Sequence, residues 1–193
     1  MEAMITALMR NRVIKTGRLI LRPFTMEDAE DMYAYASDET QTTYVFPKHE
    51  TLEETERILA EMFIATPQGK YAIELEAAHR VIGSIDLRVN ANDKTGELGY
   101  ILNQHYEGQG YMTEAAKALI IFGFETLGLN ELHAYYIEGN DRSERVMQRI
   151  GMTYRGTLPQ FKIHRGVPVD FNIYSITVDT YHNMKRDGKV FEV

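Results

Sequence analysis

The sequence predicts an α+β fold in which a mixed, mostly antiparallel sheet of about seven strands is flanked by about four helices. Three observations predict it. Residues 71–102 form three strand patterns joined by short turns, so these strands are antiparallel neighbours. Residues 97–137 follow a strand, helix, strand pattern, which permits one parallel crossover. Residues 153–178 have the pattern of a closing hairpin that turns at Arg165-Gly166.

The composition is that of one globular domain. The chain has 193 residues, of which 44% are hydrophobic and 25% charged, and this length suffices for one sizeable core. No internal repeat, low-complexity segment or linker interrupts it. We assign residues 1–15 to an N-terminal arm and residues 16–193 to a single domain.

Charge and composition argue against several classes of protein. The net charge of −7 argues against a protein that binds nucleic acids independently of sequence, since such proteins depend on basic surfaces. The chain contains no Cys, which excludes disulfides, a thiol nucleophile and cysteine metal sites. No apolar run has membrane-spanning length and no signal peptide is recognisable. We therefore expect a cytoplasmic protein without nucleic-acid or membrane partners.

The N-terminal half begins with a strand and two helices. Residues 18–24 have the pattern of a strand that Pro23 ends. Thr25, with Asp28 three residues later, is a helix-start signature, and apolar residues follow at helical spacing. Residues 37–50 have no regular pattern, and residues 52–65 predict a second helix before the three strands.

The C-terminal half contains two further helices. The first runs from Thr113 to about Leu127, is apolar on nearly every side and has Gly128 as its C-cap. After the strand at 131–137, Gly139-Asn140-Asp141 opens the second helix, which Gly151 ends. The final hairpin completes the predicted sheet.

A loop with two glycines connects a strand to the helix that starts at Thr113. Glycines beside a helix start let backbone N–H groups close on an anion, so Gly108 and Gly110 predict a phosphate-bearing ligand. A dinucleotide fingerprint would need Gly or Ala where Thr113 stands, although an acid, Glu138, does end the next strand. A P-loop would need Gly-Lys-Ser/Thr, which is missing. A glycine-tolerant turn without a ligand is the remaining interpretation.

Three motifs resemble the GNAT superfamily of N-acetyltransferases, and most closely its RimJ/RimL branch of ribosomal-protein N-terminal acetyltransferases. The run Glu-Leu-Gly-Tyr-Ile…Tyr-Glu-Gly-Gln-Gly-Tyr-Met-Thr-Glu-Ala, residues 97–115, resembles the acetyl-CoA motif. Residues 18–29 are similar to the opening of the branch, and residues 140–152 to its Asn-x-x-Ser…Gly-Phe helix. The order and spacing match over residues 16–179.

This resemblance implies a fold and a reaction. The fold is the GNAT-type acyl-CoA N-acyltransferase fold, whose sheet splays in its middle. The reaction is acetyl-CoA-dependent transfer of an acetyl group to a primary amine, either a protein N-terminal α-amine or a small-molecule amine. The amine attacks directly within a ternary complex, without a covalent enzyme intermediate. Family members are often dimers, which implies a homodimer here.

The resemblance also implies roles for individual residues. Backbone groups of Ile101 to Asn103 would pair with the pantetheine arm, N–H groups from Gly108 to Thr113 would hold the pyrophosphate, and Asn140 would bind the pantetheine region. Ser143 would assist the thiolate leaving group. The implied cofactor residues are Ile101, Leu102, Asn103, Gly108, Gln109, Gly110, Tyr111, Met112, Thr113, Asn140 and Ser143.

The residues themselves support Ser143, although three positions, Met147, Glu107 and His105, depart from the family pattern. Ser143 is a hydroxyl on the apolar face of its predicted helix; alternatively it bonds a carbonyl one turn back. Many relatives have a Tyr general acid where Met147 stands, and the branch usually has Trp where Glu107 stands. These departures leave open a second interpretation, a non-catalytic acyl-CoA-binding or regulatory module.

The reaction needs a neutral amine and therefore a proton acceptor. An α-amine with a pKa of about 7.7–8.0 needs less help than a lysine of about 10.4. Glu97 at the start of the central strand is the first candidate base, with Glu138, Asp170 or a water as alternatives and Glu74 weaker still. The six His residues show no ligand spacing, so we predict no metal.

Overall fold

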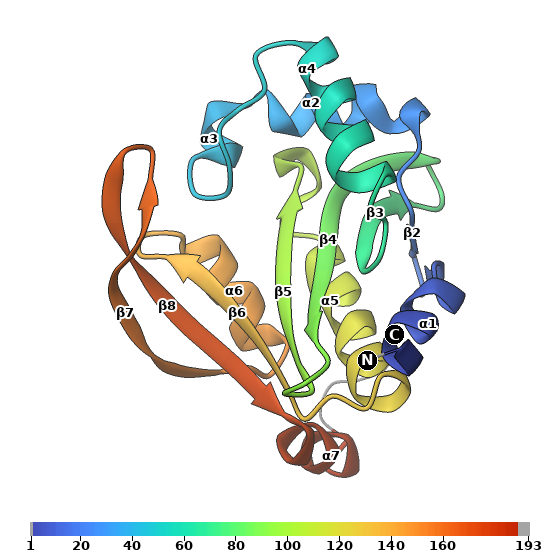
Figure 1. The fold of residues 1–193 in the computed structure, drawn as a ribbon, viewed down its shortest axis with the longest axis vertical. Helices are drawn as coiled ribbons and strands as arrows, with labels where there is room; N and C mark the ends of the chain where they lie inside the picture. Colours follow the sequence, from blue (N-terminus) through green and yellow to red (C-terminus); the bar gives the residue numbers. More distant parts are fainter. Residues whose placement is uncertain (1, 189–193) are drawn as a thin grey trace.

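The computed structural model of the protein describes residues 2–188, with side chains from residue 4 onward. Eight strands form one sheet in the order β1-β2-β3-β4-β5-β6-β8-β7 (Figure 1). They are β1 Ile14–Lys15, β2 Leu19–Arg22, β3 Lys70–Leu75, β4 Arg80–Asn90, β5 Thr95–Leu102, β6 Glu131–Ile137, β7 Thr153–His164 and β8 Val167–Thr177. Neighbours are antiparallel except β5 and β6, which confirms the predicted mixed, mostly antiparallel sheet.

Seven α-helices flank the sheet in the described part of the chain. They are α1 Glu2–Arg10, α2 Ala29–Ala36, α3 Glu39–Thr42, α4 Leu52–Ile58, α5 Tyr111–Ile121, α6 Asp141–Arg149 and α7 Val178–Arg186. Short π-helical turns extend α4 over Leu59–Ile64 and α5 over Phe122–Thr126, which accounts for the predicted lengths of both helices. Thr25 donates its N–H to the Asp28 carboxylate at 2.8 Å, as the helix-start signature predicts.

Three helices were missing from the prediction. Residues 1–15 were assigned to an arm, but α1 packs on the core through Leu8, which is 7% exposed. The segment predicted as an irregular loop contains α3, whose N-cap Asp38 accepts from the Thr40 N–H at 2.8 Å. Helix α7 buries Tyr181 alone of its residues, so its apolar periodicity was too weak to detect from sequence.

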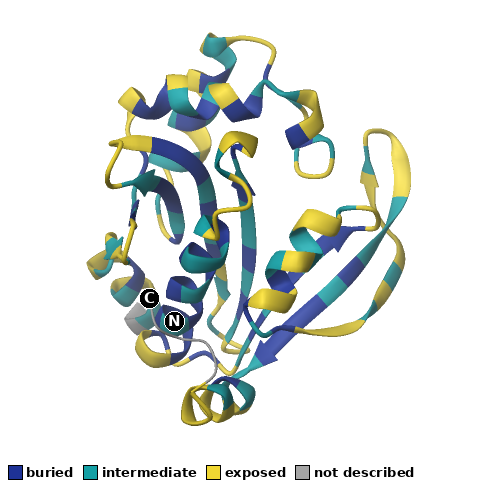
Figure 2. Cartoon of the chain, turned by 180° about the vertical axis from the view of Figure 1, so that it is seen from behind, coloured by how far each residue is buried: buried dark blue, intermediate teal, exposed yellow. Residues whose placement is uncertain are grey.

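Two hydrophobic clusters lie on opposite faces of the sheet. Tyr71 and Ile73 of β3 face the larger cluster with α5 and α6, whereas Ala72 between them faces the smaller cluster with α2. This alternation is that of a strand covered on both faces. Figure 2 shows the buried residues concentrated in the middle of the sheet and in α5, while the tip of the β7–β8 hairpin is exposed.

The parallel pair is the place where the sheet opens. Strands β5 and β6 are paired only from Thr95–Glu131 to Leu98–Ala134. Beyond that point β5 stays paired with β4 as far as Leu102, and β6 stays paired with β8 as far as Ile137. Each strand thus follows its own antiparallel neighbour, and the two diverge towards their carboxyl ends (Figure 1).

Candidate active site

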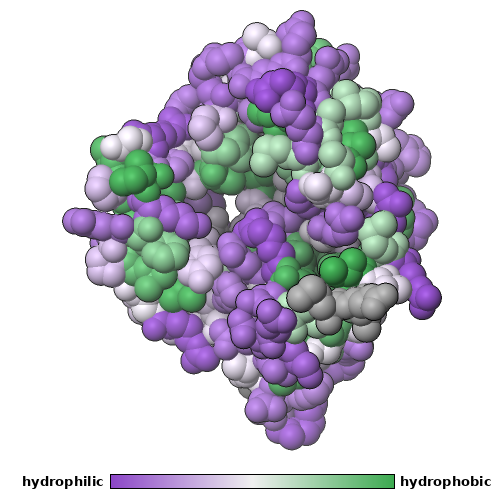
Figure 3. All heavy atoms as spheres, in the orientation of Figure 1, coloured by the Kyte–Doolittle hydropathy of each residue, from purple (hydrophilic) through white to green (hydrophobic). Residues whose placement is uncertain are grey.

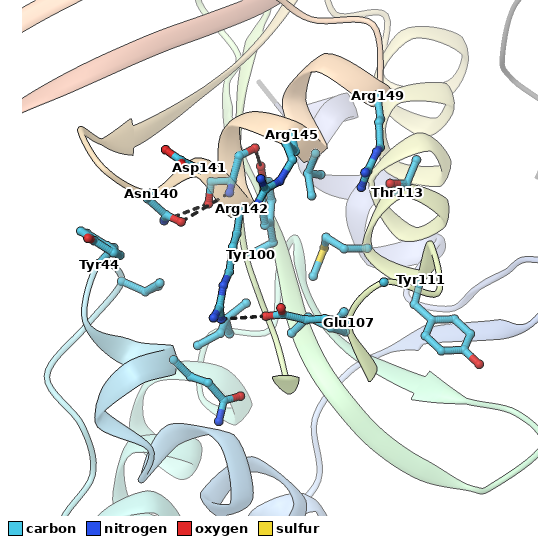
Figure 4. A pocket seen from close by; sticks show the side chains of 18 of the residues that line it. Tyr44, Tyr100, Glu107, Tyr111, Thr113, Asn140, Asp141, Arg142, Arg145 and Arg149 are labelled. Atoms are coloured by element: carbon cyan, nitrogen blue, oxygen red, sulfur yellow. Dashed lines mark hydrogen bonds and ion pairs between the residues drawn. The ribbon is translucent and has the colours of Figure 1, made fainter. Parts of the chain in front are cut away.

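A cavity of about 530 Å³ lies where β5 and β6 diverge. Its walls come from the end of β5, the glycine loop with the start of α5, the first two turns of α6, and the α3 region (Figure 4). In the space-filling view the face of the molecule is hollowed between two lobes (Figure 3). One lobe contains β6, β7 and β8, and the other contains β1 to β5 (Figure 1). Nine of the eleven predicted cofactor residues line the cavity: Ile101, Leu102, Gly108, Gly110, Tyr111, Met112, Thr113, Asn140 and Ser143.

The glycine loop presents backbone N–H groups at the start of α5. Gly108 and Gly110 have φ angles of +76° and +81°, the left-handed region that glycine adopts without strain. Residues 108–113 donate no backbone N–H to an acceptor outside the helix in the described chain, and the first turn of a helix has no intrahelical partner for them. These amides and the positive end of the α5 dipole are therefore available to bind an anion.

Arg18 on the opposite side of the loop holds it in place. Its guanidinium donates to the Gln109 carbonyl at 3.0 Å and to the Glu114 carboxylate at 2.7 Å, and lies 4.4 Å from the centre of the Tyr111 ring. Glu114 also accepts from the Thr16 hydroxyl at 2.6 Å. Burial tends to raise the pKa of Glu114, but these hydrogen bonds outweigh it and lower that pKa.

Backbone hydrogen bonds decide which part of β5 faces the gap. The Asn103 N–H donates to the Ile82 carbonyl at 2.8 Å, so it is directed towards β4. The Ile101 carbonyl also faces β4, because a Cβ on Gly83 would lie 2.4 Å from it. Alternation along the strand then directs the backbone of Leu102 into the gap. Of the three residues predicted to pair with pantetheine, only Leu102 has this orientation.

Asn103 lies outside the lining of the cavity and caps a short turn. Its side-chain oxygen accepts from the His105 N–H at 3.0 Å, capping the short turn Gln104–Tyr106, and the residue is 7% exposed. Gln109 is the other predicted residue outside the lining. Its carbonyl accepts a hydrogen bond from Arg18. Both residues shape the loop.

Asn140 and Ser143 form the first turn of α6. The Asn140 side chain caps the helix by accepting from the Ser143 N–H at 3.4 Å, and its Nδ2 donates to Ser143 Oγ at 3.0 Å. Because Oγ already accepts one hydrogen bond, the hydroxyl proton can be donated towards the cavity. The alternative that Ser143 bonds a carbonyl one turn back does not describe this geometry.

Tyr100 connects β5 to the same turn, and sequence reasoning did not single it out. Its hydroxyl donates to the Ser143 carbonyl at 3.0 Å, and burial raises the pKa of the phenol, so it remains a neutral donor. The side chain lines the cavity. Its position in the sequence could have identified it. Tyr100 lies two residues before Leu102 on the strand, so the two residues share one backbone orientation.

The candidate bases do not converge on the cavity. Glu97 accepts from Arg88 at 2.6 Å, and neither lines the cavity. Glu138 is exposed, and Asp170 accepts from the Gln160 N–H at 2.8 Å. Glu74 is paired with Arg22 on β2, away from the gap.

Two other carboxylates, Glu107 and Asp141, do line the cavity. Met147, at the position where relatives have Tyr, is 1% exposed and belongs to the core. Neither Glu97 nor Met147 therefore contributes a side chain to the cavity lining, whereas Ser143, the donor that the resemblance implies for the leaving group, does.

The far wall of the cavity comes from the α3 region. Thr40, Gln41, Tyr44 and Val45 line it, and Gln41 accepts from the Gln104 N–H at 2.8 Å. The tip of the β7–β8 hairpin reaches this wall through two contacts: His164 Nε2 with the Thr43 carbonyl at 2.6 Å, and an Arg165–Glu39 ion pair. The two lobes thus meet beyond the cavity.

Residues 2–188 contain no group of three or more His, Asp or Glu side chains placed to bind a metal ion. Within the same range, no helix has the length and hydropathy to cross a membrane.

Comparison with known proteins identifies the family. The model of the acetyltransferase (GNAT) domain matches residues 18–153. An uncharacterized N-acetyltransferase, YoaA, of Bacillus subtilis is 31% identical over 171 residues, covering 85% of this chain and 96% of its own. A ribosomal-protein-serine acetyltransferase of Escherichia coli is 31% identical over 104 residues, covering 52% and 56%.

A solved structure supports the same assignment. The crystal structure of a GNAT-family acetyltransferase from Bacillus anthracis has a TM-score of 0.79 and 28% identity, covering 86% of this chain and 99% of that one. The fold expected from the motifs is therefore confirmed, including the sheet that parts at its only parallel pair. The chain belongs to the GNAT acetyltransferase family.

Proposed function

We propose that the protein transfers the acetyl group of acetyl-CoA to a primary amine, by direct attack within a ternary complex. One observation carries the proposal: a cavity at the parted strands has unpaired amides of the glycine loop on one wall and the oriented Ser143 hydroxyl on another. The first wall suits a diphosphate, and the second suits a leaving group that gains negative charge.

The residues of the cavity fit the parts of acetyl-CoA. In our proposal the N–H groups of residues 108–113 hold the diphosphate, and the backbone of Leu102 pairs with the pantetheine arm. Asn140 and Ser143 lie beside the thioester. The loop contains no Lys or Arg between residues 104 and 112, so its contribution to phosphate binding comes from amides and the dipole of α5.

The chemistry needs one bond formed and one broken. The amine nitrogen attacks the acetyl carbon, the C–N bond forms, and the C–S bond breaks to release a thiolate. The proton that the nitrogen loses as it becomes an amide is taken up by the thiolate, which leaves as the thiol. The Ser143 hydroxyl donates a hydrogen bond to that sulfur, which stabilises it where charge develops. No covalent enzyme intermediate is needed.

The attacking amine must first lose a proton. That Glu97 accepts it stays a prediction, and the Glu97–Arg88 ion pair argues for water in the cavity instead. With a water chain, an α-amine of pKa about 7.7–8.0 is favoured over a lysine of about 10.4. We propose that the acceptor is a protein N-terminus or a small-molecule amine of similar basicity, as for the branch of RimJ and RimL. We further propose a cytoplasmic homodimer, on the precedent of that branch.

Two measurements on the purified protein test this function. Acetyl-CoA should raise the melting temperature, because a ligand that binds only the native state stabilises it. Thiol release should then occur with at least one member of a panel of N-terminal peptides, amino acids and polyamines. No melting shift at saturating acetyl-CoA would rule out the proposal.

A second candidate is a non-catalytic acyl-CoA-binding module. The burial of Met147 in the core favours it, since no general acid occupies the position used by relatives. Such a module would show the melting shift without thiol release for any acceptor. Release that falls in Ser143→Ala would decide for the enzyme.

A further inference from the structure

An ion pair spans the cofactor cleft. Arg142, on the first turn of α6, donates to Glu107, in the loop before α5, with 3.0 Å between the guanidinium and carboxylate atoms. Both side chains line the cavity, one from each wall. Figure 4 shows Arg142 extending from α6 to Glu107 across the opening. A ligand that lies between the glycine loop and α6 therefore meets this pair.

The charge of Glu107 is unfavourable for the ligand that the loop suits. Glu107 directly precedes Gly108, and the loop from residue 104 to 112 has no Lys or Arg to compensate it. A carboxylate beside a diphosphate repels it, more strongly where the surroundings exclude water. In the structure Glu107 forms an ion pair with Arg142, from the other wall.

We propose that the Glu107–Arg142 ion pair is a latch across the cleft, and that CoA opens it by taking Arg142 as a phosphate ligand. This inference rests on the proposed function of the cleft. It assigns Arg142 to diphosphate binding and assigns Glu107 to competing with the ligand for the same guanidinium.

The exchange is energetically accessible. The two side chains keep 55% and 36% of their exposure, and ion pairs of this kind contribute little to stability. A guanidinium binds phosphate oxygens through paired hydrogen bonds, which are stronger than those to a partly solvated carboxylate. Arg145 and Arg149 line the same wall of the cavity, so α6 presents further positive charge to the phosphates of a bound CoA.

The test measures CoA affinity by calorimetry in the full chain. Glu107→Gln removes the competing charge and should lower the Kd for CoA by roughly threefold to tenfold at low ionic strength. Arg142→Gln should raise that Kd by at least a similar factor. Pantetheine, which lacks the phosphates, should respond to neither substitution by more than about twofold.

A matched control separates local from long-range charge effects. Glu61 accepts from Arg57 at 3.1 Å in a more exposed ion pair on the extension of α4. Glu61→Gln makes the same change in net charge and should leave the Kd for CoA unchanged. Melting temperatures of the unliganded variants establish that each is folded.

The outcomes are distinguishable from a failure of the proposed function. If wild type does not bind CoA, the function of the cleft is wrong. If wild type binds CoA but Glu107→Gln leaves the Kd unchanged or raises it, the latch alone is overturned. An equal gain in Glu61→Gln, or an equal gain for pantetheine, would overturn it as well.

Discussion

Asn140 Nδ2 donates to Ser143 Oγ at 3.0 Å, so the residue that caps α6 also orients the hydroxyl at its first turn. The capping bond uses the amide oxygen of Asn140, and the orienting bond uses its amide nitrogen. The two tasks can therefore be separated by a single substitution, because a carboxylate caps a helix but does not donate.

Asn140→Asp should keep the stability of the protein and lose activity. The carboxylate still accepts the Ser143 N–H, and the helix N-terminus favours its charge. Asn140→Ala loses both bonds and should cost about 1 kcal/mol of unfolding free energy as well. Denaturant unfolding and kcat for the best acceptor measure the two effects. Equal activity in Asn140→Asp and wild type would contradict an orienting role.

Ser143→Ala should lower kcat by roughly tenfold to a hundredfold, since one hydrogen bond to the leaving sulfur is lost. The Kd for CoA should change by less than about threefold, because the diphosphate contacts lie elsewhere. Ser143→Thr keeps a hydroxyl and should retain more activity than Ser143→Ala. Initial rates and calorimetry separate these parameters. A loss of affinity with unchanged kcat would place Ser143 in binding alone.

Gly110→Ala should weaken CoA binding through the backbone. Gly110 has φ +81°, and the nearest atom to an added Cβ, on Arg18, is 3.6 Å away, so the strain is conformational. It should cost about 1 kcal/mol of stability and tilt the loop amides. Gly128→Ala is the control: its φ is +66°, nothing lies within 4 Å of an added Cβ, and it directly follows Leu127, the C-cap of the extension of α5. Both variants should lose similar stability, but only Gly110→Ala should bind CoA more weakly.

Asp86→Asn should change the pH dependence of stability. Burial raises the pKa of Asp86 from 3.8 to about 6, with Arg88 opposing the shift and Glu97 adding to it. The native state therefore binds more protons than the unfolded chain between these values. The contribution of Asp86 is present below pH 3.8 and lost as pH rises through about 6.

The Asn side chain stays neutral throughout that window. Relative to wild type, Asp86→Asn should gain about 2 kcal/mol of unfolding free energy between pH 4 and pH 7.5, because most of the difference in proton binding between the native and unfolded states of wild type lies in that range. Urea titrations across the range measure the difference. A constant difference between the two proteins would show that the Asp86 pKa is not raised.

Sequence reasoning recovered the parts of the site that depend on local pattern. The glycines, the helix start at Asn140 and the strand around Glu97 all carry their signals within a few residues, and the helix predicted from Thr113 begins two residues earlier, at Tyr111. Glu97 itself illustrates the limit. Its place at the head of the central strand was evident, but its partner Arg88 comes from β4, opposite it in the sheet. No spacing along the chain reveals that pairing.

The amino-acid sequence by itself determined the order of strands β2 to β8 and of helices α2, α4, α5 and α6, the family, and the loop that suits a phosphate, because each depends on periodicity or on short motifs. Only the tertiary structure decided that β5 and β6 part after Leu98, that Asn103 is directed away from the gap, and that Arg142 meets Glu107 across it. These features arise from which strand each strand pairs with. Strand pairing joins residues far apart in the chain and is set by the packing of the whole sheet.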